Sequence, residues 1–216
     1  MNSTLDVLGY KVFNSSLDKA DYSEKTLINT FSPNSYGLAT KDPFFKEALR
    51  NTDILVLDGV GIALGSLFLH GKNIKKIAGQ DCFDYFTAKG NENHWKIFFM
   101  GSSPKTLEKI TTRLKQEYPN IQTAVYSPPF KPEFSEEDNL QIIESINAFK
   151  PDVLFVGLTA PKQEKWSYQH KNQLNARVIS TIGNVFDWYA GVRLETEWKS
   201  NQIRISPYLV MACSMT

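Results

Sequence analysis

The chain has 216 residues, of which 42% are hydrophobic and 22% are charged, and its formal net charge is +1. This length predicts one domain, or one domain with a small appendage, and leaves enough residues to bury a sizeable core. The balanced charge gives no support to a nucleic-acid-binding protein, in which a basic excess or a basic stripe is usual.

Five short apolar segments indicate buried parallel strands. Each is a nearly continuous apolar run without strict polar alternation, which is the pattern of a strand covered on both faces of its sheet. In chain order the strands are expected at residues 26–31, 53–59, 95–101, 152–158 and 176–183.

Helical segments lie between these strands and give the chain an alternating order. The second helix begins with Ser103 as N-cap and Pro104 at its first position, and the third has Ser135 as N-cap. Alternation of strand and helix predicts an α/β fold, Rossmann-like, with a mostly parallel sheet and helices on both faces. The helices are expected at residues 42–51, 103–119, 135–151 and 160–174, and a proline-rich loop at 126–134.

Ligands of such folds bind beyond the carboxyl ends of the strands, so the loops that follow the strands are the place to seek a site. One of these loops reads DGVG, with Asp58 directly after an apolar run. A carboxylate there can bind a nucleotide, accept a proton or cap a helix. As a dinucleotide fingerprint the glycine spacing is one residue too long, and Asp81 does not follow a clear strand, so a nicotinamide dehydrogenase is the weaker interpretation.

Three further segments admit both a binding and a purely structural interpretation. GSSPKT (101–106) is typical of an anion-binding turn at a helix N-terminus, and equally of a turn closed by a serine cap. In APKQEKW, Lys162 opposes the helix dipole, which suits contact with a bound anion, whereas the alternative is a solvated first turn with Trp166 packing inward. The aromatic residues beside Asp187 in NVFDWYAG suit stacking on a sugar or uracil, and core packing explains them equally well.

The sequence carries no metal-site spacing: it has no H-E-x-x-H, no paired cysteines and no D-x-D between a strand and a turn. We therefore expect no metal and no cofactor. Cys82 and Cys213 lie far apart, the N-terminus does not read as a signal peptide, and no apolar run approaches the roughly 18 residues of a spanning helix. A reduced, cytoplasmic compartment is expected.

Six segments occur together in a recognisable order between about residue 10 and residue 191: TLINTFSPNSYGLATKDPFFKEAL, DILVLDGVGIALG, KKIAGQDCF, FFMGSSP, PDVLFVGLTAPKQEKW and IGNVFDWYAG. Together they resemble the WecG/TagA/CpsF-type bacterial glycosyltransferases. That family includes the teichoic-acid N-acetylmannosaminyltransferase and the enterobacterial-antigen N-acetylmannosaminuronyltransferase. DGVG and APKQEKW are the specific pair.

The resemblance implies an inverting, metal-independent enzyme that works at the inner face of the cytoplasmic membrane as a peripheral protein. The implied donor is a UDP-sugar, with N-acetylmannosamine or a relative as the sugar. The implied acceptor is N-acetylglucosamine (GlcNAc) on undecaprenyl diphosphate, in surface polysaccharide or teichoic acid biosynthesis. Self-association is allowed by the resemblance, and a nucleic-acid partner is not expected. The alternative is a non-catalytic, UDP-sugar-binding component of a polysaccharide assembly complex.

By the same resemblance, Asp58 matches the family's base, Thr30 its active-site threonine, and Gln163 the glutamine of its P-K-Q motif. Inversion needs such a base, because the acceptor hydroxyl loses its proton as it attacks the anomeric carbon. Lys76 stands where arginine is usual, which keeps the charge and loses bidentate geometry. The residues expected to bind substrate are Ser32, Asn34, Gly59, Gly61, Lys76, Gly79, Asp81, Gly101, Ser102, Pro129, Phe130, Thr159, Pro161, Lys162, Gly183, Asn184 and Asp187.

We expect two parts along the chain, a glycosyltransferase α/β domain at residues 1–191 and a short or truncated C-terminal appendage at residues 192–216. In the family, the segment after this point is a longer, basic and apolar appendage that helps membrane attachment and supplies arginines to the active site. Arg193 and Arg204 are the candidates for those arginines here. Ser32 stands where asparagine is usual, which shortens the hydrogen-bonding group.

Overall fold

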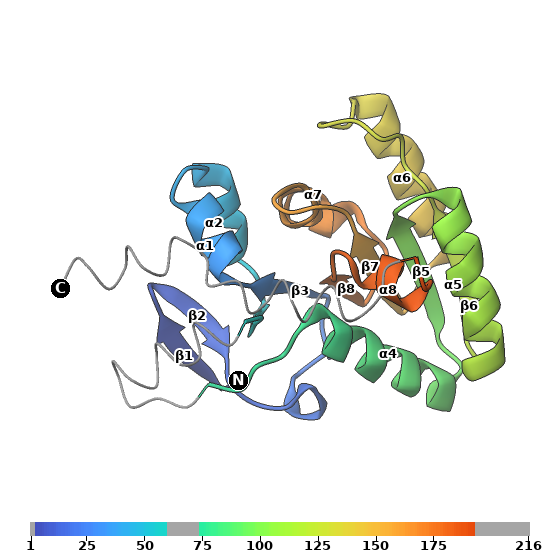
Figure 1. Cartoon of the computed structure of the whole chain (residues 1–216), viewed down its shortest axis with the longest axis horizontal. Coiled ribbons are helices and arrows are strands. Elements are labelled where there is room, and N and C mark those ends of the chain that lie inside the picture. Colours follow the sequence, from blue (N-terminus) through green and yellow to red (C-terminus); the bar gives the residue numbers. More distant parts are fainter. Residues whose placement is uncertain (1–2, 60–73, 193–216) are drawn as a thin grey trace.

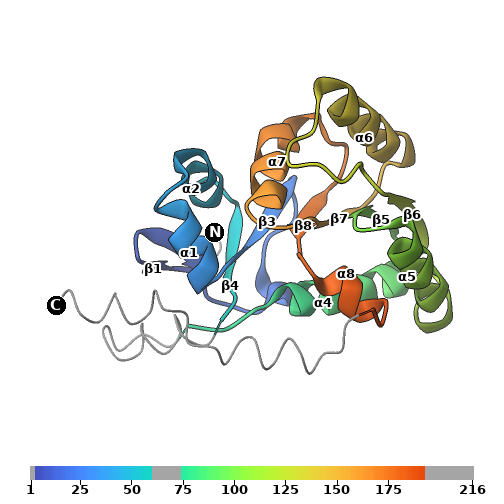
Figure 2. The same ribbon diagram turned by 45° about the horizontal axis from the view of Figure 1, so that its top comes forward.

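The computed structural model describes residues 3–59 and 74–192, which form one eight-stranded sheet with helices on both faces (Figure 1, Figure 2). The strand order is β1-β2-β4-β3-β8-β7-β5-β6, and every neighbouring pair is parallel except β1 with β2. The α/β fold expected from the sequence, with its mostly parallel sheet, is confirmed.

The five strands predicted from apolar runs are all present, with slightly tighter bounds. Nearly all of their residues are buried, as expected when helices cover both faces of a parallel sheet. They are β3 (Thr26–Phe31), β4 (Ile54–Leu57), β5 (Lys96–Gly101), β7 (Val153–Gly157) and β8 (Val178–Thr181).

Three strands were not predicted, and each has a local reason. β1 (Thr4–Val7) and β2 (Tyr10–Phe13) form a hairpin whose turn places Leu8 and Gly9 at φ angles of 54° and 80°. Such turns usually carry Asn-Gly, so a leucine conceals the signal. β6 (Gln122–Tyr126) is a partly exposed edge strand that begins with two polar residues and lacks the longer apolar run that identifies the central strands.

The four predicted helices are also present, and their predicted caps are confirmed. Ser103 Oγ accepts the Thr106 N–H, and Ser135 Oγ accepts the Asp138 N–H, both at 3.2 Å. A short 3₁₀ helix, η2 (Lys171–Gln173), follows the last of them. The helices are α2 (Pro43–Arg50), α5 (Pro104–Glu117), α6 (Glu136–Phe149) and α7 (Lys162–His170).

Helices α1 (Pro33–Ala39), α4 (Gly79–Asn93) and α8 (Val185–Tyr189), with the short η1 (Leu17–Lys19), were not predicted. The α4 sequence contains glycine, threonine and asparagine, which are weak helix formers. Its N-terminus is stabilised by the Asp81 carboxylate, which accepts the Ala78 backbone N–H at 2.6 Å. A negative charge in the first turn also suits the helix dipole.

The core lies on both faces of the sheet. One face packs on α4, α5 and α8 through buried aromatic side chains such as Phe83, Phe155 and Phe186, and the other packs on α6 and α7, where Trp166 is buried. A third apolar cluster lies under α1 and α2. Parallel pairing in register then brings the carboxyl ends of the central strands to one edge of the sheet.

The ends of β5 and β7 approach each other at a pair of glycines, Gly101 and Gly157. Gly101 has a φ of +126°, and a Cβ there would overlap the Gly157 carbonyl oxygen. Only glycine permits both this conformation and this approach. The turn that follows directs Ser102 over the edge of the sheet.

Gly101→Ala is therefore expected to lower the free energy of unfolding by about 2–4 kcal/mol, through backbone strain and a backbone clash. The matched control is Gly191→Ala, because Gly191 also has a positive φ (+65°) but meets nothing within 4 Å. Its cost is expected to be about 1 kcal/mol. Urea unfolding measures both variants, and equal losses would contradict the assignment of a clash.

Candidate active site

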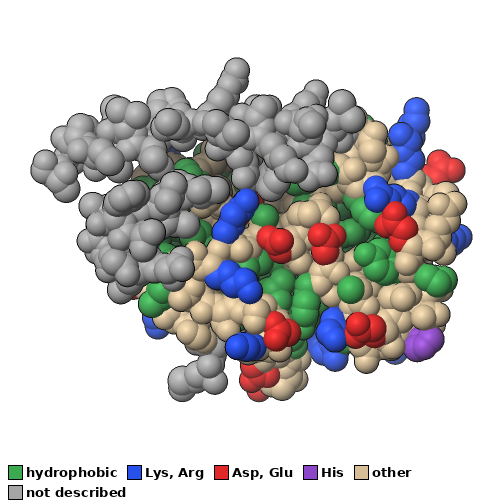
Figure 3. All heavy atoms as spheres, turned by 60° about the horizontal axis from the view of Figure 1, so that its bottom comes forward, with side chains coloured by type: hydrophobic (Ala, Val, Ile, Leu, Met, Phe, Trp, Pro, Cys, Tyr) green, Lys and Arg blue, Asp and Glu red, His purple; other side chains and the backbone are tan. Residues whose placement is uncertain are grey.

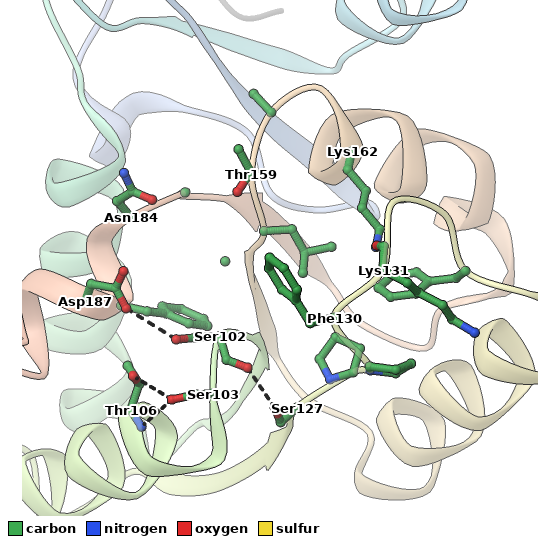
Figure 4. Close-up of a pocket in the computed structure, with 18 of the residues that line it drawn as sticks. Ser102, Ser103, Thr106, Ser127, Phe130, Lys131, Thr159, Lys162, Asn184 and Asp187 are labelled. Atoms are coloured by element: carbon green, nitrogen blue, oxygen red, sulfur yellow. Dashed lines mark hydrogen bonds between the residues drawn. The ribbon is translucent and has the colours of Figure 1, made fainter.

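Two adjoining cavities open at the carboxyl edge of the sheet. The larger, of about 950 Å³, lies over the ends of β5, β7 and β8, between the 127–134 loop and the start of α8 (Figure 4). The smaller, of about 370 Å³, lies over the ends of β3 and β4 and beside the starts of α1, α4 and α7. The residues common to both walls are Leu158, Thr159, Ala160, Gly183 and Asn184.

The smaller cavity contains the three residues expected to be catalytic, Thr30, Asp58 and Gln163. Asp58 directly follows β4 and is half-buried, and its backbone N–H donates to the Phe31 carbonyl at 2.8 Å. That bond continues the pairing of β3 with β4 and fixes the backbone of Asp58 at the cavity. Residues from the end of β3, the loop after β4 and the first turn of α7 are thus brought together, although their catalytic roles stay a prediction.

Other expected binding residues line the same cavity, among them Ser32, Asn34 and Gly79. Ser32 Oγ accepts the Ser35 N–H at 3.1 Å and so acts as the N-cap of α1. At Gly79, a Cβ would lie 2.9 Å from the Ile182 carbonyl oxygen, so α4 can begin this close to the end of β8 only because the residue is glycine.

The buried side-chain amide of Gln163 connects two walls of the smaller cavity. Its Oε1 accepts the Gly183 backbone N–H at 3.1 Å, and its Nε2 donates to Glu164 Oε1 at 2.9 Å. The amide therefore ties the first turn of α7 to the end of β8. Both partners of this amide also line the cavity.

Glu164 was not predicted as a site residue. Its side chain is 1% exposed, and burial raises the pKa of its carboxyl to about 7. Among the described residues, its Oε2 has no hydrogen-bond partner. A sequence signal was available in APKQEKW, because a glutamate in the first turn of a helix usually reaches back to the N-cap N–H, and Pro161 has none.

In the larger cavity, Ser102 connects α8 to the 127–134 loop (Figure 4). Its Oγ donates to Asp187 Oδ1 at 3.3 Å, and its carbonyl oxygen accepts the Ser127 hydroxyl at 2.7 Å. Asp187 thereby presents a carboxylate to the cavity. Phe130 is fully exposed, and its ring projects toward the middle of the cavity (Figure 4).

Lys162 lines the larger cavity, but its ammonium group is engaged by the 127–134 loop. Nζ donates to the Lys131 carbonyl at 2.6 Å and lies 3.4 Å from the centroid of the Phe134 ring. Desolvation by burial lowers the pKa of this lysine. Lys131 in turn forms an ion pair with Asp138 of α6. The loop is thus held by both α6 and α7, and the anion contact expected for Lys162 stays a prediction.

The expected residues therefore fall into three groups. The first group lines a cavity and includes Pro129 and Pro161 as well as the residues already placed above. The second group lines neither cavity and consists of Gly59, Lys76, Asp81 and Gly101. The third lies outside the described residues. Lys76 lies beside the end of β4 through a bridge with Leu57, and Asp81 caps α4. The residues that fall outside the described parts of the chain are Gly61, Arg193 and Arg204.

Metal-type clusters, membrane-spanning helices and separated surface charge would each bear on the function of residues 3–59 and 74–192. No three His, Cys, Asp or Glu side chains in these ranges gather as a metal site would require. No described helix has the length and apolar character to cross a membrane. On the face in Figure 3, the acidic and basic side chains of the described residues are interspersed rather than separated by sign.

The raised pKa of Glu164 predicts a pH-dependent stability. Folding favours the protonated acid, so its contribution is fully present below the ordinary pKa of 4.5 and is lost as the pH rises through about 7. Relative to wild type, Glu164→Gln should become more stable by about 2–3 kcal/mol between about pH 5 and pH 8. Urea unfolding measures this, with the exposed Glu144→Gln as control. A pH-independent difference for Glu164→Gln would contradict the expected ionisation.

Comparison with known proteins identifies the family. Residues 1–196 match the family described as "Glycosyl transferase WecG/TagA/CpsF family". The chain is 26% identical over 211 residues to an N-acetylglucosaminyldiphosphoundecaprenol N-acetyl-beta-D-mannosaminyltransferase of Staphylococcus aureus (strain NCTC 8325 / PS 47), covering 93% of this chain and 81% of the relative. The protein of that name from strain MRSA252 matches with the same identity and coverage. The chain belongs to the WecG/TagA/CpsF family of glycosyltransferases.

Proposed function

We propose that this chain is an inverting, metal-independent transferase that moves N-acetylmannosamine, or a close relative, from a UDP-sugar to GlcNAc on undecaprenyl diphosphate. The name of the S. aureus relatives supports the sugar and the acceptor. The observation that carries the proposal is the position of Asp58, in the wall of a small cavity that adjoins a larger one. In this proposal the chain is cytoplasmic, attaches peripherally to the inner face of the membrane, and serves surface polysaccharide or teichoic acid biosynthesis.

The larger cavity suits the nucleotide of the donor. Its volume of about 950 Å³ lies within the range of roughly 300–1,000 Å³ that is usual for small-molecule sites. The Asp187 carboxylate can accept hydrogen bonds from the ribose hydroxyls, and the exposed Phe130 ring can stack on the uracil. The sugar then lies at the wall shared by the two cavities.

In this arrangement the reaction proceeds by one displacement. The acceptor hydroxyl oxygen forms a bond to the anomeric carbon while Asp58 takes the hydroxyl proton. The bond between the anomeric carbon and the diphosphate oxygen breaks, and its electron pair leaves with UDP. Thr30 and Gln163, which line the same cavity as Asp58, hold the hydroxyl groups of the reacting sugars.

The departing diphosphate carries negative charge that the protein has to stabilise. Helix α5 begins at the wall of the larger cavity, at Ser103, Pro104 and Thr106, so the positive end of its dipole is directed there. Lys76 lies beside the end of β4, next to the Asp58 loop. Lys162 also contacts the diphosphate in this proposal, when that anion displaces the Lys131 carbonyl from the Lys162 ammonium group.

The direct test is a screen of UDP-sugars, including UDP-N-acetylmannosamine, against a soluble analogue of lipid-diphosphate-linked GlcNAc. Mass spectrometry is expected to detect addition of one N-acetylhexosamine unit. Tight UDP binding without transfer to any acceptor would overturn the proposal in favour of a non-catalytic binding component. A parallel NAD titration is expected to be silent.

Asp58→Asn is expected to lower kcat by about 10²–10⁴-fold, because the amide cannot take the proton. The dissociation constant for UDP should stay within about 2-fold of wild type, because UDP lies in the other cavity in this proposal. The control is Asp84→Asn, an exposed acid on α4 outside both cavities. Undiminished turnover of Asp58→Asn would remove the base from the mechanism.

Phe130→Ala is expected to weaken UDP binding by about 3- to 30-fold, because a stacking aromatic ring contributes on the order of 1 kcal/mol or more. Leu140→Ala is the control, since Leu140 is also an exposed apolar residue but lies on α6 and outside both cavities. Calorimetric titration with UDP measures both variants. Equal affinities for the two would place the uracil away from Phe130.

A further inference from the structure

The first turn of α7 is built in an unusual way. Its N-cap is Pro161, which has no backbone N–H, so the reciprocal capping bond available to a glutamate at the third helical position does not exist here. Glu164 occupies that position and is instead turned into the interior, with 1% of its side chain exposed. Burying a carboxyl group this completely is costly unless it is hydrogen-bonded, and among the described residues only its Oε1 has a partner.

The hydrogen bonds of Gln163 fix which way its amide points. The Gly183 backbone N–H can only donate, so the atom facing it must be the amide oxygen, at 3.1 Å. The amide nitrogen then faces Glu164 Oε1, at 2.9 Å. This leaves one N–H and one lone pair of the Gln163 amide for a ligand in the smaller cavity.

Among the described residues, Glu164 is the acceptor for that amide nitrogen, so it fixes the orientation of the amide together with Gly183. Without it, the bond to Gly183 alone would hold the amide, and rotation about the side chain would cost less. Helix α7 itself is held elsewhere, by an ion pair of Lys165 with Asp42 at 2.9 Å and, directly after its last residue, by one of Lys171 with Asp53 at 2.6 Å. Removing the carboxyl group should therefore leave the helix in place.

We propose that Glu164 is a positioning residue, which holds the Gln163 amide in the one orientation that presents its free N–H and lone pair to the sugar beside Asp58. The proposal rests on the proposed function, because it assigns the smaller cavity to the reacting sugars. Glu164 acts through Gln163 and has no direct part in bond formation. The role depends on an acceptor oxygen at this position and not on a negative charge.

Two replacements separate the acceptor from the size of the side chain. Glu164→Gln keeps an oxygen that can accept the Gln163 N–H, and its kcat should stay within about 3-fold of wild type. Glu164→Met keeps the length and removes the acceptor, and its kcat should fall at least 10-fold. The dissociation constant for UDP should change less than 2-fold in both. A general distortion of α7 would also weaken UDP binding, because Pro161 and Lys162 line the larger cavity.

A double-mutant cycle with Gln163→Ala tests whether Glu164 acts through Gln163. Glu164→Met should lower kcat when Gln163 is present. On the Gln163→Ala background it should cause no further loss in kcat, because the amide that Glu164 positions is then absent. Additive losses would overturn the proposal. So would a Glu164→Gln variant as slow as Glu164→Met.

A measurement without substrate keeps this proposal separable from the proposed function. In protein labelled with ¹⁵N-glutamine, the side-chain amide of Gln163 is identified by its loss in Gln163→Ala. Its protons should exchange with water faster in Glu164→Met and at the wild-type rate in Glu164→Gln. An unchanged exchange rate in Glu164→Met would refute the positioning role. A changed rate in a protein that transfers no sugar would refute the proposed function alone.

Discussion

Parallel pairing in register is the constraint on which the rest of the structure depends. All strands except β1 run in one direction, so their carboxyl ends lie at one edge of the sheet, and residues far apart in the sequence meet there. Thr30 lies at the end of β3, Asp58 directly after β4, and Gly183 just after β8. The order of the strands also places β3 next to β8, so the two halves of the chain join beside the smaller cavity.

The second constraint acts at the level of side chains. Helix α7 lies against α2 and the sheet through ion pairs to Asp42 and Asp53, and its first turn supplies Gln163 and Glu164 to the cavity. The same turn supplies Lys162, which holds the 127–134 loop through the Lys131 carbonyl and the Phe134 ring. One turn of helix therefore contributes to both cavities. Polar residues follow one another in the APKQEKW segment because this turn serves both cavities.

Much of the central fold could be predicted from the sequence because its signals are strong and local. Apolar runs identified the five central strands, and serine caps located α5 and α6. The peripheral elements could not be predicted. Leu8 occupies a turn position where Asn or Gly is usual, β6 lacks an apolar run, and α4 depends on a cap formed by Asp81 three residues inside the helix.

The candidate site was predicted in its outline and not in its contacts. Most of the residues predicted from the family resemblance and from the rule that ligands bind beyond the strand ends do line one of the two cavities. Neither could show that Asp81 caps a helix or that the Lys162 ammonium is bound by a loop, because both depend on side-chain geometry. At Glu164 the sequence shows only that a proline N-cap removes the usual capping bond of a first-turn glutamate, and the burial of the side chain becomes visible only when α7 is placed against the sheet.

A crystal structure of the complex with UDP tests the central claim most directly. The account predicts the uridine in the larger cavity, between the Phe130 ring and the Asp187 carboxylate, with the diphosphate directed toward Thr159 and Asn184, which both cavities share. Asp58 would then face the space where the sugar has to lie. UDP bound outside both cavities, or with its diphosphate directed away from Asp58, would contradict the account.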